Sequence, residues 1–94
     1  MQRVQLAKRG PELSRVVYGT WRLLATRPTA QESNWRLNSC LELGITTIDT
    51  AEIYGLYEVE KALGAALALS PGLRDKLELV TKAGIYVPCG YHPE

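Results

Sequence analysis

Apolar and polar residues first indicate a hairpin at the start of the chain. Residues 3–8 alternate polar and apolar positions, as a half-buried strand does. A turn signal follows at residues 9–12, and residues 13–18 form a second apolar run. The two runs are expected to pair as a β-hairpin, with the second strand ending at Tyr18.

The next pattern predicts a helix. Thr29 and Glu32 have the spacing of a capping box, in which a side chain and a backbone N–H satisfy each other at a helix start. An apolar face follows, and Gly44 is placed to end the helix. The face consists of Leu37, Cys40 and Leu41.

The remaining chain predicts strand, helix and strand again. Residues 45–49 and 77–82 are apolar runs of strand length. Residues 57–69 between them match the amphipathic helix template at five positions. Residues 86–94 hold two prolines and a glycine without periodicity, so a terminal loop is expected. The five apolar helix positions are Val59, Ala62, Leu63, Ala66 and Leu67.

After the hairpin, the order β-α-β-α-β predicts an α/β fold with a parallel sheet. The strands are predicted to end at Tyr18, Asp49 and Lys82, at intervals of 31 and 33 residues. A (β/α)8 TIM barrel of about 250 residues has roughly 31 residues per unit. A doubly wound sheet has similar spacing, but its G-x-G-x-x-G fingerprint is absent after every strand.

Three parallel strands cannot close a barrel. Residues 1–94 are therefore predicted to be the N-terminal portion of a barrel domain, with a leading hairpin, three strands and two helices.

The composition of the chain argues against several classes of binding partner. The chain is 46% hydrophobic and 22% charged with a net charge of +1, which gives no electrostatic case for nucleic acid or an anionic membrane. It has neither a membrane-length apolar run nor a signal-peptide pattern, so a cytoplasmic protein is expected. Cys40 and Cys89 are interpreted as free thiols, with a disulfide as the alternative, and no metal-binding spacing occurs.

Three side chains suggest proton-transfer chemistry. Asp49 and Lys82 end neighbouring strands about 5 Å apart, so an ion pair is expected, and Tyr54 lies in a short loop beside them. A nearby ammonium stabilises a phenolate. Tyr54 could therefore protonate an alkoxide as it forms from a carbonyl, with Lys82 assisting and Asp49 orienting the lysine.

Each residue also has a simpler interpretation. Asp49 could satisfy backbone N–H groups after its strand, Tyr54 could pack on the following helix, and Lys82 could be solvated. Trp21 could be a packing residue rather than the wall of a pocket or the flank of a flat cofactor ring. His92, the only histidine, is interpreted as solvated.

Residues 44–55, GITTIDTAEIYG, closely resemble the signature of the aldo-keto reductases. Glu60 with Leu63-Gly64, and Val80-Thr81-Lys82, resemble the helix and lysine strand that follow it in this family. Gly19-Thr20-Trp21 resembles the end of the family's first strand, and residues 18–23 resemble a bacterial oxidoreductase branch.

The resemblance implies a (β/α)8 barrel plugged by the N-terminal hairpin, which reduces an aldehyde or ketone with NADPH. It implies that Tyr54 donates the proton and that Lys82 and Asp49 assist it. Residues near the nicotinamide and the carbonyl substrate would be Gly19, Thr20, Trp21 and Asp49.

Two expected parts of that family do not occur in the sequence. A histidine at the end of the fourth barrel strand is missing, and His92 is not placed to supply it. The residues for the adenosine and phosphate of the cofactor, from late strands and loops, are also absent. The 94-residue chain is therefore expected to be inactive alone. Two alternatives are a non-catalytic barrel that binds a nicotinamide cofactor as a sensor or regulatory subunit, and a truncated, inactive fragment.

Overall fold

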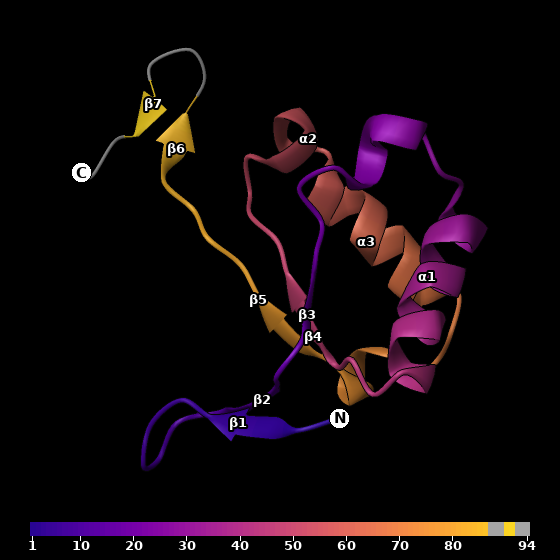
Figure 1. Cartoon of the computed structure of the whole chain (residues 1–94). Helices are drawn as coiled ribbons and strands as arrows, with labels where there is room; N and C mark the ends of the chain where they lie inside the picture. The colour runs from indigo at the N-terminus through magenta and orange to yellow at the C-terminus, as the bar shows by residue number, and fades with distance from the viewer. Residues whose placement is uncertain (87–89, 92–94) are drawn as a thin grey trace.

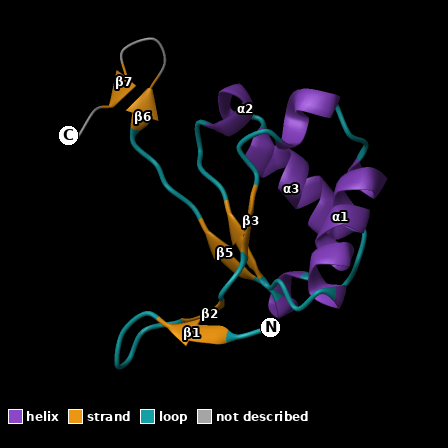
Figure 2. Cartoon of the chain, in the orientation of Figure 1, coloured by secondary structure: helices purple, strands orange, loops and turns teal. Residues whose placement is uncertain are grey.

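A parallel three-stranded sheet forms the centre of the computed structural model, which describes residues 1–86 and 90–91. The strands are β3 (Val17–Gly19), β4 (Thr47–Asp49) and β5 (Glu78–Val80), in the order β3-β4-β5. Gly19 lies opposite Asp49, and Asp49 lies opposite Val80. The predicted parallel sheet is confirmed, and the carboxyl ends of its strands meet at one rim (Figures 1 and 2).

Helices α1 (Ala30–Glu42) and α3 (Val59–Ala68) cover one face of this sheet (Figure 1). The capping box of α1 is formed: the Glu32 N–H donates to Thr29 Oγ1 at 3.1 Å, and the Thr29 N–H donates to Glu32 Oε1 at 3.2 Å. Ile48 of β4 is fully buried under the helices. The core comprises Leu23, Leu37, Ile48, Val59, Leu63, Ala66, Leu73 and Leu77.

Short helical turns connect these elements. They are η1 (Leu23–Thr26), α2 (Tyr54–Tyr57) and η2 (Arg74–Lys76). The turn α2 precedes α3 and begins at the predicted proton donor.

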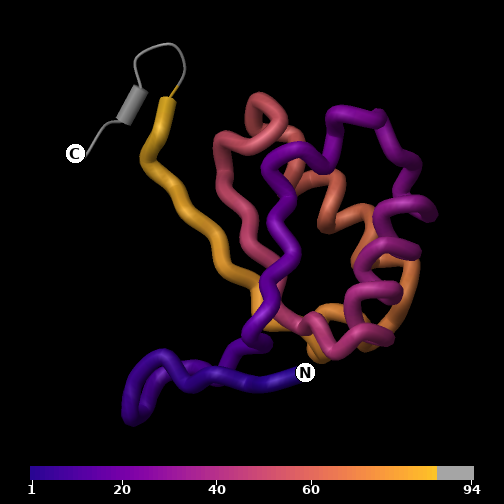
Figure 3. The backbone as a smooth tube through the Cα atoms, in the orientation of Figure 1, coloured from indigo at the N-terminus to yellow at the C-terminus, as the bar shows by residue number. Residues whose placement is uncertain are grey.

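The leading hairpin is formed by β1 (Arg3–Gln5) and β2 (Glu12–Ser14), which pair antiparallel. The prediction of one strand over residues 13–18 was wrong, because the chain bends between β2 and β3. The Ser14 hydroxyl donates to the Val16 carbonyl and accepts from the backbone N–H groups of Thr46 and Thr47 at 3.1 and 3.0 Å. These contacts turn the hairpin away from the sheet, below it in Figure 3.

Two further predictions need correction. All three residues of β1 are exposed, so its alternating pattern does not mark a buried face. The terminal loop was also wrong in part, because β6 (Ile85–Tyr86) and β7 (Gly90–Tyr91) pair antiparallel. Two-residue strands are too short to show periodicity.

The cysteine and histidine predictions are tested only in part. Cys40 is a free thiol inside the molecule, and burial raises its pKa. Cys89 and His92 lie outside the described residues.

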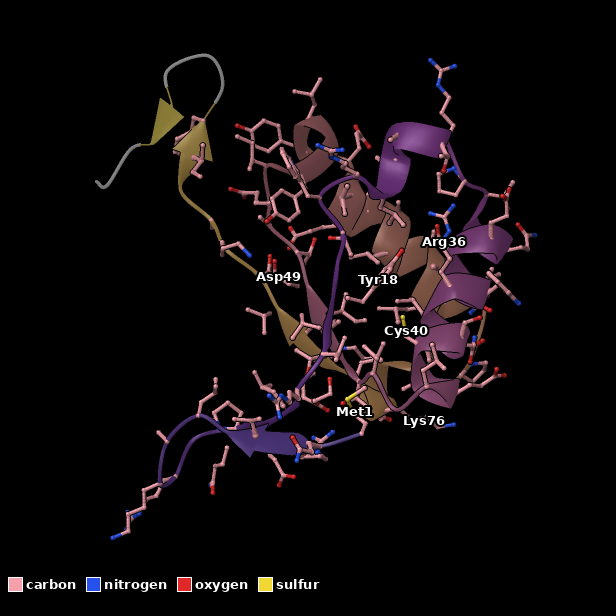
Figure 4. The ribbon with its side chains drawn as sticks, in the orientation of Figure 1. Met1, Tyr18, Arg36, Cys40, Asp49 and Lys76 are labelled. Carbon is pink, nitrogen blue, oxygen red and sulfur yellow. The ribbon has the colours of Figure 1, made fainter. Side chains whose placement is uncertain are left out.

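No helix of the described residues covers the second face of the sheet (Figure 2). Tyr18 packs against the core, whereas Asp49 points to the other side of the sheet (Figure 4). Strands β3 and β5 are both edges, so the sheet is unclosed. Within residues 1–86 and 90–91, no helix has the length and apolarity needed to span a membrane.

Candidate active site

An ion pair lies at the carboxyl rim of the sheet. Lys82 Nζ donates to Asp49 Oδ1 at 2.8 Å and to the Thr50 carbonyl at 2.7 Å. The backbones are aligned by the Thr50 N–H, which donates to the Val80 carbonyl, and by the Glu52 N–H, which donates to the Lys82 carbonyl. Both bonds extend the pairing of β4 and β5 beyond the strands, which places the lysine next to the aspartate.

The lysine is held in its charged form. Its hydrogen bond to Asp49 is the largest cause that raises the pKa of Lys82, and partial burial opposes it. The charge of Asp49 and the proximity of Tyr54 raise the pKa of Lys82 further. At neutral pH the rim therefore carries a fixed ammonium.

The Tyr54 ring lies beside that ammonium. Lys82 Nζ is 5.4 Å from the centroid of the ring, a distance typical of a cation–π contact. The Tyr54 N–H donates to the Ala51 carbonyl at 3.1 Å, which starts the turn α2. The ring is half-buried against the core, so its backbone and its ring are both held in place.

Gly19, Thr20 and Trp21, at the end of β3 and just after it, have different environments. A Cβ built on Gly19 would meet no atom within 4 Å, so there is open space beside Asp49. Trp21 is 65% exposed, and the Arg22 guanidinium lies 5.1 Å from its ring centroid. Thr20, by contrast, is fully buried. Its N–H and its hydroxyl both donate to the Asp49 carbonyl at 3.0 Å, which fixes the end of β4.

The structure brings Asp49, Tyr54 and Lys82 together and places Gly19 next to them. Sequence reasoning missed Thr50 and Arg22. Thr50 directly follows Asp49, and its backbone carbonyl accepts the second hydrogen bond from Lys82 Nζ. Arg22 follows Trp21 directly, but adjacency alone does not predict stacking.

The rim can support proton transfer to an oxygen that develops negative charge. A phenol, an ammonium and a carboxylate form one chain of contacts at the edge of an open sheet face. Among the described residues, no three His, Cys, Asp or Glu side chains cluster closely enough to hold a metal ion.

Comparison with known proteins identifies the family. The Aldo/keto reductase family matches residues 15–93, the segment that carries the whole rim. The chain belongs to the aldo/keto reductase family. Members of this family have a (β/α)8 barrel, and the unclosed sheet is consistent with an incomplete one.

Three bacterial relatives of this aldo/keto reductase chain are oxidoreductases by name. It is 48% identical over 98% of its length to a 6-dehydroglucose reductase of Agrobacterium fabrum. It is 46% identical over 90% of its length to oxidoreductase YdhF of Escherichia coli, in the branch predicted from residues 18–23. It is 48% identical over 99% of its length to the uncharacterized oxidoreductase YcsN of Bacillus subtilis.

The chain spans only about a third of these relatives. It covers 31%, 28% and 31% of their respective lengths. The family match and the names of these relatives therefore support carbonyl reduction by an oxidoreductase in general. They do not show the activity of a whole protein.

Proposed function

We propose that a complete protein containing this chain reduces an aldehyde or ketone to an alcohol with NADPH, and that this chain supplies the proton donor. One observation carries the proposal: the Lys82 ammonium lies both 2.8 Å from Asp49 Oδ1 and 5.4 Å from the Tyr54 ring centroid. An ammonium at this position would stabilise a phenolate of Tyr54, at the rim where barrel enzymes of this architecture bind substrate.

The proton donor in this proposal is the Tyr54 phenol, which gives its proton to the carbonyl oxygen as that oxygen becomes an alkoxide. Lys82 stabilises the resulting phenolate by its charge. Asp49 keeps Lys82 protonated and directs it toward Tyr54, since its hydrogen bond is the largest cause of the raised pKa. A later proton from water would restore the phenol.

The residues near the rim fit the reacting end of a nicotinamide cofactor. When bound, the cofactor would supply the hydride to the carbonyl carbon. Gly19 leaves open space beside Asp49, where a flat ring could lie. Exposed Trp21 could flank this ring, while Thr20 would act by fixing the Asp49 backbone. The adenosine and phosphate contacts, and a fourth catalytic side chain, would come from the rest of a complete barrel.

The test is cofactor oxidation by the complete protein with a panel of aldehydes and ketones. The panel includes 6-dehydroglucose, because the Agrobacterium relative is named for it. NADPH-dependent turnover is expected, and Tyr54→Phe should lower kcat by at least about 100-fold, within the usual range for loss of a general acid. Preference for NADH would contradict the cofactor part alone.

The second candidate is a sensor that binds the cofactor without turnover. Asp49, Tyr54 and Lys82 would also suit such a sensor, since an ammonium beside an open sheet face can bind a cofactor without any reaction. Tight NADPH binding, measured by fluorescence, with no turnover that depends on Tyr54 would favour the sensor. An inactive protein that also fails to bind NADPH would favour the truncated fragment.

A further inference from the structure

Tyr54 and Lys82 belong to two different loops, and their chemistry requires these loops to stay in register. Tyr54 lies after β4, and Lys82 lies after β5. The bond from the Glu52 N–H to the Lys82 carbonyl, at 2.8 Å, holds the loops together near the sheet. Farther from the sheet, the loop that carries Tyr54 turns back toward α3, so another contact is needed there.

A second tyrosine supplies that contact. The Tyr57 hydroxyl donates to the Ile85 carbonyl at 2.9 Å, across 28 residues of sequence. Tyr57 lies three residues after Tyr54, and Ile85 lies three residues after Lys82. The hydrogen bond therefore joins the two loops just beyond the two reacting side chains.

The backbone between the two tyrosines adopts a rare conformation. Gly55, Leu56 and Tyr57 all have positive φ, at 60°, 53° and 70°. For a non-glycine residue this conformation is unfavourable, because its Cβ lies too close to the following carbonyl oxygen. Leu56 is 73% exposed, so burial of its own side chain does not offset the cost. The turn persists because its surroundings fix it, and the Tyr57 hydrogen bond is one of those restraints.

The opposite side of the loop rests on the core. A Cβ on Gly55 would lie 2.8 Å from Val59 Cγ2 and 2.9 Å from Leu24 Cδ1, so the backbone there lies close to one buried and one partly buried side chain of the core. On the Lys82 side, the loops leave a cavity of only about 10 Å³, lined in part by Ile53 and Ala83. That volume is about one water molecule. Tyr54 is thus held between the core and the loop of Lys82.

We propose that Tyr57 is a positioning residue, which fixes the distance between the Tyr54 phenol and the Lys82 ammonium through its bond to the Ile85 carbonyl. In this role it acts through the loop of Lys82. The inference rests on the proposed function for its kinetic consequence, but the loop contact itself can be tested without turnover.

The experiment compares Tyr57→Phe with Tyr18→Phe in the complete protein. Both changes remove one hydroxyl, but Tyr18 packs against the core on the opposite side of the sheet. Tyr57→Phe should speed deuterium uptake of the backbone at residues 82–86 by about 5-fold, with α1 unchanged, since loss of one hydrogen bond is typically about 1 kcal/mol. It should lower kcat about 5- to 10-fold and change the KM for NADPH less than 2-fold. Tyr18→Phe should change neither exchange at residues 82–86 nor kcat.

Unchanged exchange at residues 82–86 in Tyr57→Phe would overturn the loop contact. Faster exchange with wild-type kcat would overturn the positioning role. An equal drop in kcat for both variants would also overturn it, since the effect would then be general. If wild type reduces no carbonyl compound, the proposed function fails, and the exchange measurement still decides whether Tyr57 joins the loops.

Discussion

At the scale of single residues, the Asp49–Lys82 ion pair has a position that stability alone does not explain. Its side chains are 37% and 49% exposed. Exposed ion pairs typically stabilise a fold by 0 to about 1 kcal/mol. The pair spans adjacent strands that backbone hydrogen bonds already join. Its main effect is therefore local: it fixes an ammonium beside a phenol.

Asp49→Asn should separate the effect of the ion pair on stability from its effect on the position and charge of Lys82. The pKa of Lys82 should fall toward its ordinary value, because its largest supporting hydrogen bond weakens. We expect kcat to fall about 10-fold, while the free energy of unfolding changes by less than about 1 kcal/mol. The measurements are kcat with NADPH, the Lys82 pKa by NMR titration, and a urea midpoint.

The sign of the pH effect provides a control. A raised pKa means that the pair stabilises the fold at neutral pH and loses this contribution only as pH rises above about 10.5, the ordinary value for lysine. At pH 7 the two proteins should therefore differ by the full contribution of the pair, which is less than about 1 kcal/mol because both side chains are partly exposed. A lowered Lys82 pKa with unchanged kcat would contradict the assigned role of Asp49.

At the scale of elements, a polar network fastens the exposed hairpin to the lower end of the sheet. Glu78 of β5 accepts hydrogen bonds from the Thr46 and Thr47 hydroxyls at 2.6 and 3.0 Å, and forms an ion pair with Arg3 of β1 at 3.3 Å. Arg3 also pairs with Glu12 of β2. The network joins both hairpin strands to the sheet through polar contacts.

Glu78 should make stability depend on acid. Burial alone would raise its pKa, but the hydrogen bonds from Thr46 and Thr47 and the charge of Arg3 outweigh burial and lower the pKa. A lowered pKa means that the stabilisation is present above the ordinary value of 4.5 and is lost as pH falls below it. Glu78→Gln should therefore lower the urea midpoint at pH 7 and flatten the midpoint's decline below pH 4.5.

The matched control is Glu42→Gln, on the exposed end of α1. It makes the same chemical change outside the network and should leave the shape of the pH dependence unaltered. Equal pH profiles for wild type and Glu78→Gln would show that the network does not fasten the hairpin.

The sequence allowed prediction of elements whose signals are local. The capping box at Thr29 and the five apolar positions of α3 each lie within a few turns of chain. The Asp49–Lys82 pair was also predictable, because parallel strands bring their carboxyl ends to one rim. Its geometry follows from topology and needs no side-chain detail.

The features that the sequence did not predict depend on contacts between residues distant in sequence. The bend after β2 is fixed by Ser14 with the backbone of Thr46 and Thr47, more than 30 residues later. The left-handed turn places Leu56 and Tyr57 in a conformation that neither residue favours by itself. Its restraint, the bond to Ile85, is 28 residues away. A local pattern could not reveal either feature.

At the scale of the whole molecule, the described part has one well-packed face and one open face. Two helices cover one side of the sheet, and Asp49 points to the other (Figures 1 and 4). A groove of about 160 Å³ lies between α3 and the edge strand β5, and its lining includes Leu63, Leu67 and Leu79. In a closed (β/α)8 barrel, further strands and helices would cover these surfaces. Carbonyl reduction is therefore proposed for a complete protein.

The most direct test of the account is kcat for NADPH-dependent carbonyl reduction by Lys82→Met in the complete protein, with Lys76→Met as control. Both changes remove an ammonium, but Lys76 is exposed in η2, far from Asp49 (Figure 4). Without its charged neighbour, Tyr54 becomes a poor proton donor. Lys82→Met should lower kcat at least about 100-fold, and Lys76→Met should stay within 2-fold of wild type. A Lys82→Met protein with wild-type kcat would contradict the account.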